Sequence, residues 1–159
     1  MSSKTILPQN EAVLRKKFPV VLQRIIEIGE RMPQDYFYED SETGSTLMIQ
    51  RGEFNFPAYG KFKKENLNKR WFSSLVLHPE SLYAVTGFGD GSHLSHFLEN
   101  STSGTTLLAT EKDPALLRET LARFDLSNLL SSERFILGTG EINDAFKKAL
   151  HEHGLILSV

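Results

Sequence analysis

The chain has 159 residues, of which 40% are hydrophobic and 24% charged, and 18 basic against 20 acidic residues give a net charge of −2. This composition suits one globular domain with a real core, and it excludes a global field that would attract nucleic acid or an anionic membrane. The absence of cysteine excludes disulfides and thiol chemistry, and no apolar run has the length of a signal peptide or a membrane span, so we expect a cytoplasmic protein.

Two helices are predicted at the start of the chain. The first runs through Ala12 to Lys17, with Asn10 as its N-cap. Pro19 does not fit inside this helix, because it lacks an N–H and clashes with the preceding turn, but it suits the first position of a second helix that reaches about Glu30. The apolar residues of the second helix recur at helical spacing and are Val21, Leu22, Ile25, Ile26 and Ile28.

The periodicity changes between Tyr36 and Tyr59, where aromatic and β-branched residues predominate. Turn-forming residues at Ser41–Gly44 and at Arg51–Gly52 divide this stretch, which predicts two or three short antiparallel strands. A basic and amide-rich connector follows from Lys61 to Trp71, and we expect it to be partly helical. Its charge run is typical of a solvated face rather than of an anion-binding patch.

From residue 82 onward, strands and helices alternate. Strands are expected at 82–86, 105–110, 134–138 and 155–159, and helices at 92–98, 114–124 and 142–151. The helix over 114–124 has Asp113 as its predicted N-cap and Pro114 at its first position. Repeated strand–helix units predict a parallel sheet with right-handed crossovers. We therefore expect an α/β fold, in which a Rossmann-like three-layer domain with a mostly parallel sheet (residues 73–159) follows N-terminal helices, a small antiparallel β segment and the connector (residues 1–72).

The last predicted strand, Leu155–Val159, has the composition of a buried strand. An unfinished sheet edge there invites pairing with another chain, and a homodimer is one way to complete it. A strand of this type at the end of the chain also suggests a compact half-sheet domain or a piece of a longer protein.

Glycines occupy alternate positions, Gly87, Gly89 and Gly91, in the loop after the first predicted parallel strand. Glycine suits this place because the backbone must reach positive φ or approach a ligand closely. The N–H groups of the loop and of the following helix could receive an anion or a carboxylate. Asp90, beside the glycines, is the loop acid that we would mutate first, although a turn-forming aspartate also fits there.

The other strand ends carry further candidates. Glu111 lies roughly 20 residues beyond the first glycine, the spacing at which an acid contacts ribose in nucleotide-binding folds. An interaction with the following helix dipole explains it equally well. The third strand end, residues 138–141, is another backbone-accessible loop that ends in an acid. The candidate ligand-binding residues are therefore Gly87, Gly89, Asp90, Gly91, Glu111, Gly138 and Glu141.

Two cofactor motifs are incomplete in this sequence. The dinucleotide pattern Gly-x-Gly-x-x-Gly fails at its third glycine, which is Ser92. The first motif of class I methyltransferases is similar to the glycine loop, but the acid that usually lies two residues before the first glycine is replaced by Val85. The spacing therefore predicts the fold better than it predicts a bound cofactor.

Side chains that often carry chemistry form no clear constellation. The histidine pairs at 93 and 96 and at 151 and 153 lack a third ligand, so no metal site is predicted. The serines cluster in turns, and no Ser/His/Asp arrangement emerges. Trp71 and Phe72 favour packing over base stacking. We assign no catalytic residue.

Several segments in chain order resemble the N-terminal domain of the bacterial motility accessory factor family, whose members are associated with the transfer of nonulosonic (sialic-acid-like) sugars to flagellin. The resemblance covers nearly the whole chain and is sharpest after residue 82, although each motif is short. At the second strand end the family usually reads Ile-Glu-Pro, where this chain has Thr110-Glu-Lys-Asp-Pro114. The similar segments are residues 10–22, 47–52, 83–94, 108–114 and 124–130.

The resemblance implies a noncatalytic module, because the family's transferase chemistry is attributed to a separate, following domain. Gly87, Gly89, Gly91 and Glu111 match the family's loop and acid, and no catalytic residue carries over. The implied partners are a following catalytic domain or a flagellin-type protein, and the implied ligand is a nucleotide-sugar or another nucleotide.

An S-adenosylmethionine-dependent methyltransferase is the alternative from the enzyme class. Its cofactor would lie over Gly87–Gly91, with the ribose on Glu111 and the adenine near Gly138–Glu141. A fragment of a dinucleotide oxidoreductase is a third and weaker interpretation, because of Ser92.

Overall fold

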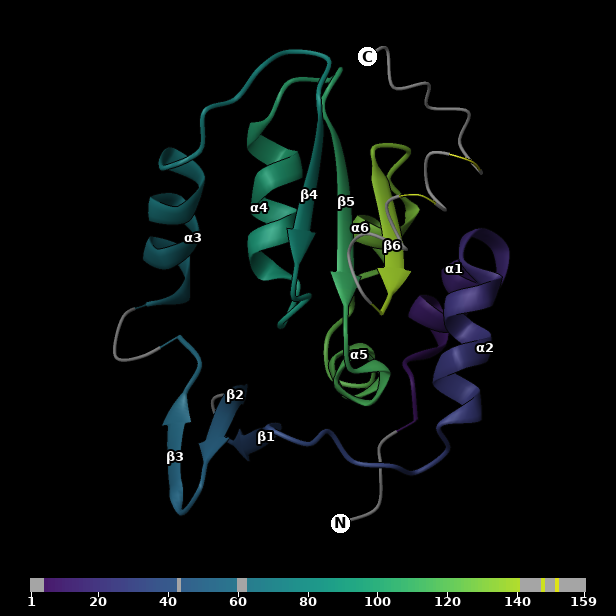
Figure 1. Cartoon of the computed structure of the whole chain (residues 1–159), viewed down its shortest axis with the longest axis vertical. Helices are drawn as coiled ribbons and strands as arrows, with labels where there is room; N and C mark the ends of the chain where they lie inside the picture. The colour runs from purple at the N-terminus through teal and green to yellow at the C-terminus, as the bar shows by residue number, and fades with distance from the viewer. Residues whose placement is uncertain (1–4, 43, 60–62, 141–146, 148–150, 152–159) are drawn as a thin grey trace.

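The computed structural model describes residues 5–42, 44–59, 63–140, 147 and 151 (Figure 1). The described helices are α1 (Pro8–Lys17), α2 (Pro19–Glu27), α3 (Lys64–Ser73), α4 (Ser92–Asn100), α5 (Pro114–Leu121) and α6 (Ser127–Ser131). The described strands are β1 (Tyr36–Ser41), β2 (Gly44–Arg51), β3 (Phe54–Pro57), β4 (Leu82–Thr86), β5 (Thr106–Glu111) and β6 (Phe135–Thr139). Strands β1–β3 form an antiparallel sheet, and β4–β6 form a parallel sheet. The expected α/β fold, with N-terminal helices and a small antiparallel sheet ahead of a parallel sheet, is confirmed.

The described helices that follow the parallel strands pack on one face of the sheet (Figure 1). The strands lie in chain order, β4-β5-β6, so each crossover leads to the next strand on the same side of the one before. Because the crossovers of parallel strands are right-handed, the helices within them then lie on the same face of the sheet. A switch point needs a reversal of strand order, and none occurs among the described strands. Glu111 and the glycine loop belong to adjacent strands of this progression.

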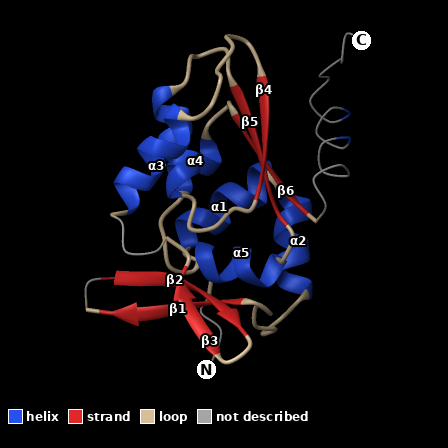
Figure 2. Cartoon of the chain, turned by 60° about the vertical axis from the view of Figure 1, so that its left-hand side comes forward, coloured by secondary structure: helices blue, strands red, loops and turns tan. Residues whose placement is uncertain are grey.

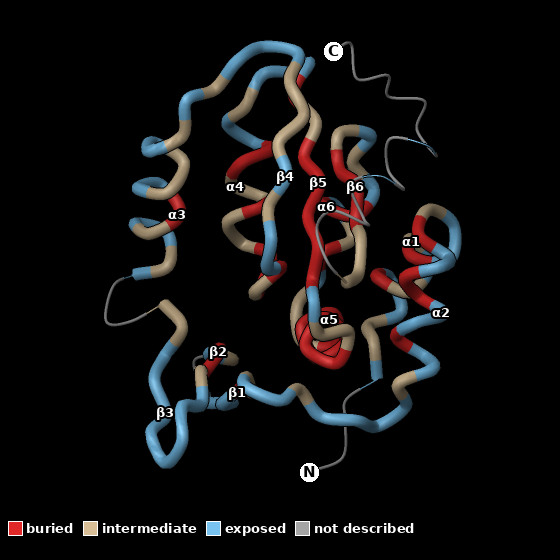
Figure 3. Tube along the Cα trace, in the orientation of Figure 1, coloured by how far each residue is buried: buried red, intermediate tan, exposed pale blue. Residues whose placement is uncertain are grey.

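Among the described strands, β4 lies at the edge of the parallel sheet and is not buried. It pairs with β5 alone among the described strands, and Ala84 and Thr86 are exposed, whereas β5 is buried from Leu107 to Glu111 (Figure 3). The opposite face of the sheet carries a small apolar group that includes Leu108 and Ile136. The helix expected over 142–151 lies largely, and the strand expected over 155–159 entirely, outside the described residues.

Helix α1 begins at Pro8, with Leu7 as its N-cap, so the prediction that Asn10 caps it is wrong. Asn10 instead lies in the first turn of the helix, and it is fully buried. Its Nδ2 donates to the carbonyls of Leu121 (2.9 Å) and Phe124 (2.7 Å), and its Oδ1 accepts from the N–H of Leu126 (2.9 Å). The backbone that leaves α5 needs partners for its polar groups, and the amide of Asn10 supplies them.

The N-terminal segment and the parallel sheet share one core. Leu14, Phe18 and Ile25 from α1 and α2 belong to the same buried cluster as the sheet residues Leu107 and Phe135. The antiparallel sheet packs separately against α5, where Tyr38 and Leu47 meet Leu116. It lies at the end of the molecule toward which the parallel strands point (Figures 1 and 2).

Within the described ranges, no helix combines the length and the apolar composition that crossing a membrane requires.

Candidate functional site

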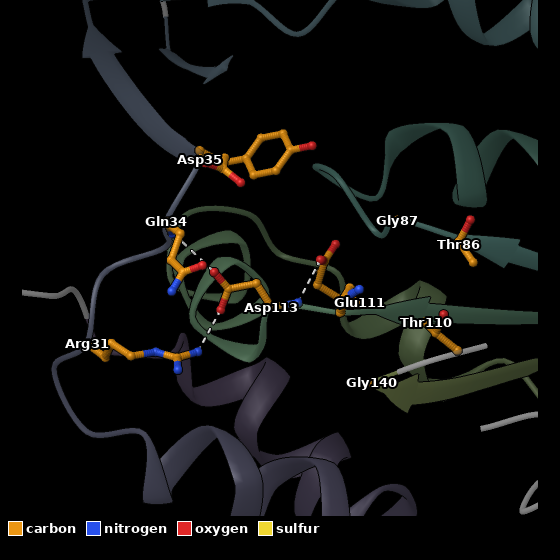
Figure 4. A pocket seen from close by; sticks show the side chains of 11 residues that line it. Arg31, Gln34, Asp35, Thr86, Gly87, Thr110, Glu111, Asp113 and Gly140 are labelled. Atoms are coloured by element: carbon orange, nitrogen blue, oxygen red, sulfur yellow. Dashed lines mark hydrogen bonds and ion pairs between the residues drawn. The ribbon is translucent and has the colours of Figure 1, made fainter. Parts of the chain in front are cut away.

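A cavity of about 700 Å³ opens at the carboxyl ends of the parallel strands (Figure 4). One wall comes from the linker between α2 and β1, and the floor comes from the strand ends and their loops. This is the edge at which parallel α/β sheets bind their ligands. The described lining residues are Arg31, Gln34, Asp35, Tyr36, Thr86, Gly87, Thr110, Glu111, Lys112, Asp113 and Gly140.

The three glycines of the loop after β4 have different surroundings. All three have positive φ, as the sequence predicted for a sharp strand-to-helix turn. A Cβ on Gly87 would meet no atom within 4 Å, whereas one on Gly89 would lie 2.9 Å from the Tyr59 hydroxyl and one on Gly91 would lie 3.0 Å from a Leu126 methyl. Gly87 alone of the three lines the cavity, and the other two allow close packing inside the protein.

Most backbone N–H groups of the glycine loop are already hydrogen-bonded within the protein. Gly87 donates to the carbonyl of Thr110 (2.8 Å), and Gly91 donates to the carbonyl of Phe88 (3.0 Å). The N–H groups at positions 88, 90 and 92 donate to the side chains of Glu111, Tyr59 and Asp90. The loop is therefore a packed turn, and it lacks the cluster of free N–H groups from which an anion nest is built.

Glu111 holds the glycine loop and also lines the cavity. Its Oε2 accepts from the N–H of Phe88 (3.0 Å) and its Oε1 from the N–H of Asp113 (3.1 Å). Burial raises the pKa of this carboxyl, and the backbone hydrogen bonds oppose that rise. A carboxylate has about four acceptor positions. Glu111 therefore keeps acceptor capacity for a ligand hydroxyl.

Asp90 lies behind the loop and not in the cavity. It is buried, accepts from the Tyr59 hydroxyl (2.9 Å) and from the N–H of Ser92 (3.0 Å), and forms an ion pair with Lys64. Burial acts to raise the pKa of Asp90, but the contacts with Lys64 and Ser92 outweigh it and lower the pKa. Asp90, which precedes the N-cap Gly91, thus binds the first residue of α4 and joins this helix to α3. Lys64, which the sequence placed on a solvated face, ties the basic connector to the loop.

Asp113 fixes the wall of the cavity. It caps α5 as predicted, through a hydrogen bond from the N–H of Ala115 (2.9 Å). The same carboxylate binds the guanidinium of Arg31 (2.9 Å) and the N–H of Gln34 (3.3 Å), as Figure 4 shows. The sequence predicts Asp113 only as a cap, and the wall of the cavity was not predicted. A run of polar residues between a helix and a strand gives no sign of the distant element that it contacts.

The remaining candidates lie around this arrangement. Gly138 pairs with Thr110 inside the parallel sheet, and Gly140 lines the cavity in its place. Glu141 lies outside the described residues. Of the predicted ligand-binding residues, Gly87 and Glu111 therefore meet in the cavity.

The histidines of α4 pack against aromatic rings. His93 meets Trp71 edge-on with ring centroids 5.3 Å apart, and His96 meets Phe72 at 5.6 Å. Trp71 and Phe72 also contact Phe97, so both have the packing role that the sequence favoured. Across the described residues, no three histidine or acidic side chains converge as metal ligands would.

Comparisons of the chain with protein-family models, with curated proteins and with solved structures found no match.

Proposed function

We propose that this chain is a noncatalytic, Rossmann-like binding module of motility accessory factor type, and that its cavity holds a small nucleotide-type ligand. The observation that carries this proposal is the cavity at the carboxyl edge of the parallel sheet, where the open side of Gly87 lies beside the carboxylate of Glu111. Cavities at this edge are the usual ligand sites of α/β sheets. The sequence resemblance to the family supports the wider assignment.

Each lining group has a part in binding. Gly87 lets a ligand approach the backbone, because no side chain fills the space above it. Glu111 accepts a hydrogen bond from a ligand hydroxyl, and Gln34 offers both donors and an acceptor. Tyr36 adds an aromatic surface to the wall. Binding is favoured over catalysis, because the carboxylate of Glu111 is held by two backbone N–H groups.

A methyltransferase is the second candidate, and the position of Glu111 favours it. An acid at the end of the second parallel strand, beside a glycine loop, suits a contact with the ribose of S-adenosylmethionine. The two functions differ in turnover. A methyltransferase would convert S-adenosylmethionine to S-adenosylhomocysteine in the presence of an acceptor, and a binding module would not.

Thr86→Phe tests the site without disturbing the core. Thr86 is exposed, lies on strand β4 and lines the cavity, so a phenylalanine there suits a strand and fills the binding space. Ala84→Phe is the matched control, because Ala84 is an exposed residue two positions earlier on the same strand face and is not among the described lining residues.

Isothermal titration with S-adenosylmethionine, S-adenosylhomocysteine and CMP-sugars then decides the proposal. We expect saturable binding of at least one compound by the natural chain and by Ala84→Phe, and its loss in Thr86→Phe. Absence of binding by every compound, or equal binding by both variants, would overturn the assignment of the cavity. Turnover of S-adenosylmethionine would replace the binding module with the methyltransferase.

A further inference from the structure

Two helices begin next to the carboxyl edge of the parallel sheet, and both N-termini already hold a carboxylate of the protein. Asp90 accepts from the N–H of Ser92 at the start of α4 (3.0 Å), and Asp113 accepts from the N–H of Ala115 at the start of α5 (2.9 Å). In nucleotide-binding folds, the helix N-terminus is where a ligand phosphate binds. Asp90 is ion-paired with Lys64 and Asp113 with Arg31, so side chains of the protein occupy both N-termini, and a phosphate would have to displace them.

The cavity itself is acidic. Its described lining contains the three carboxylates of Asp35, Glu111 and Asp113, against the cations of Arg31 and Lys112. The guanidinium of Arg31 is already paired with Asp113 at 2.9 Å. A phosphate in this cavity would lose part of its hydration shell. It would also be repelled by the carboxylates of the lining, because like charges repel more strongly where water is excluded.

The glycine loop does not offset this repulsion. The N–H groups at positions 87, 88, 90, 91 and 92 all donate within the protein. Binding a phosphate through them would break hydrogen bonds that hold the loop, and the released acceptors include the carboxylates of Glu111 and Asp90. The acceptor-rich lining instead suits hydroxyl and amino donors and a positive centre.

We propose that the cavity selects a phosphate-free nucleoside-type ligand and rejects its phosphorylated counterpart. This inference rests on the proposed function, because it requires that the cavity bind a ligand. Ribose hydroxyls donate to the carboxylates of Glu111 and Asp35, and the heterocycle lies against Tyr36. A cationic substituent on the nucleoside strengthens binding, whereas a phosphate weakens it.

Matched pairs that differ only by a phosphate test the selectivity. Adenosine with AMP, and cytidine with CMP, are titrated into the full chain by calorimetry at low and at high salt. We expect the better nucleoside to bind about tenfold or more tightly than its monophosphate at low salt, and the ratio to shrink as salt screens the repulsion. Equal or tighter binding of the monophosphate overturns the selectivity and leaves the binding function standing. Binding of CMP-sugars without binding of either nucleoside likewise overturns the selectivity alone. Absence of binding by all four compounds, by S-adenosylmethionine, by S-adenosylhomocysteine and by CMP-sugars overturns the binding function and the selectivity with it.

A charge-reversal pair tests the cause. Asp35 is exposed at the cavity wall, so Asp35→Lys changes the local charge without disturbing packing. Glu39→Lys makes the same change at an exposed position of β1 that is not among the described lining residues. We expect Asp35→Lys to reduce the preference for the nucleoside several-fold and Glu39→Lys to leave it unchanged. The same effect in both variants, or none in Asp35→Lys, would contradict an electrostatic origin in the cavity.

Discussion

The carboxylate of Glu111, at the end of β5, accepts a hydrogen bond of 3.0 Å from the backbone N–H of Phe88 in the neighbouring glycine loop. Phe88 itself has no exposed surface and meets Phe135 edge-on in the core. The loop is thus held by two contacts of Phe88, the hydrogen bond from its N–H to Glu111 and the packing of its ring against Phe135. The same acid lines the cavity, so the position of the loop and the chemistry of the site depend on one side chain.

The stability contributed by Glu111 should fall as the pH rises. Burial raises its pKa above the ordinary 4.5, so the folded chain binds this proton more tightly than the unfolded chain does. The contribution of Glu111 to the free energy of unfolding is therefore largest below pH 4.5 and is lost as the pH rises through the higher folded-state pKa. Urea unfolding between pH 4 and pH 8 measures it as the difference between the natural chain and Glu111→Gln.

Glu39→Gln removes an exposed acid from β1 and controls for the change in net charge. We expect the difference between the natural chain and Glu111→Gln to decrease steadily with pH, and the corresponding difference for Glu39→Gln to stay nearly flat. A difference that grows with pH would mean that the hydrogen bonds to Glu111 outweigh its burial.

Local signals predicted much of this fold. Strand β4 was predicted with its observed bounds, because a short apolar run between a turn and a glycine loop is unambiguous. Asp113 and Pro114 marked the start of α5, since an N-cap and a first-turn proline act within one helical turn. The turn predicted at Arg51–Gly52 likewise separates β2 from β3, and β1 ends and β2 begins within the stretch predicted to divide them.

Features that depend on distant parts of the chain escaped sequence analysis. Asn10 looks like a helix cap, yet its partners lie more than 100 residues away. Helix α6 has 5 residues, too few for a helical periodicity to show, and it was not predicted. The cavity wall includes Arg31 and Gln34, whose partner Asp113 lies 82 and 79 residues further along the chain. The meeting of the glycine loop with Glu111 could be predicted, because consecutive strands of a parallel sheet end at the same edge.

Replacing Asn10 with leucine should strongly destabilise the fold. The substitution removes the Asn10 amide from the carbonyls of Leu121 and Phe124 and from the N–H of Leu126. The Leu121 carbonyl keeps the N–H of Leu7 (3.1 Å). Loss of three such hydrogen bonds should lower the free energy of unfolding by about 3 kcal/mol or more. Chemical denaturation measures the change, and Lys16→Leu, at an exposed position of the same helix, is the control. A loss below about 1 kcal/mol would show that water replaces the amide at little cost.

The fluorescence of Trp71 should report the protonation of His93. Trp71 is the only tryptophan, and its ring lies 5.3 Å from that of His93. Burial lowers the pKa of His93 below 6.5, against opposing effects of Asp90 and of a hydrogen bond with the Gly87 backbone. Because an imidazolium quenches indole emission, fluorescence should fall on acidification with a midpoint below pH 6.5. The stability that neutral His93 contributes is complete above pH 6.5 and is lost as the pH falls through the lowered pKa.

Two variants distinguish the source of that fluorescence change. His93→Gln should remove the transition, and His96→Gln should leave it, because the ring of His96 packs on Phe72. A transition that survives in His93→Gln would assign the signal to another group or to acid unfolding.

Alanine substitutions at Gly87 and Gly91 should separate backbone strain from crowding. Both glycines have positive φ, +90° and +78°, so an alanine at either position costs about 1–2 kcal/mol of backbone strain. At Gly87 the new Cβ enters open space, but at Gly91 it would lie 3.0 and 3.1 Å from the two methyl groups of Leu126. Overpacking of this kind adds about 1–3 kcal/mol, so Gly91→Ala should be clearly the more destabilising of the two.

A double-mutant cycle with Leu126→Ala isolates the crowding at Gly91. Removing the Leu126 methyl groups makes room for the new Cβ. Gly91→Ala should therefore lower the free energy of unfolding less in the Leu126→Ala background than in the natural chain, so that the two substitutions couple favourably. Gly87→Ala shares no contact with Leu126 and should be additive with it. Additivity in both cycles would mean that backbone strain alone selects glycine at position 91, and that the loop does not depend on its close approach to Leu126.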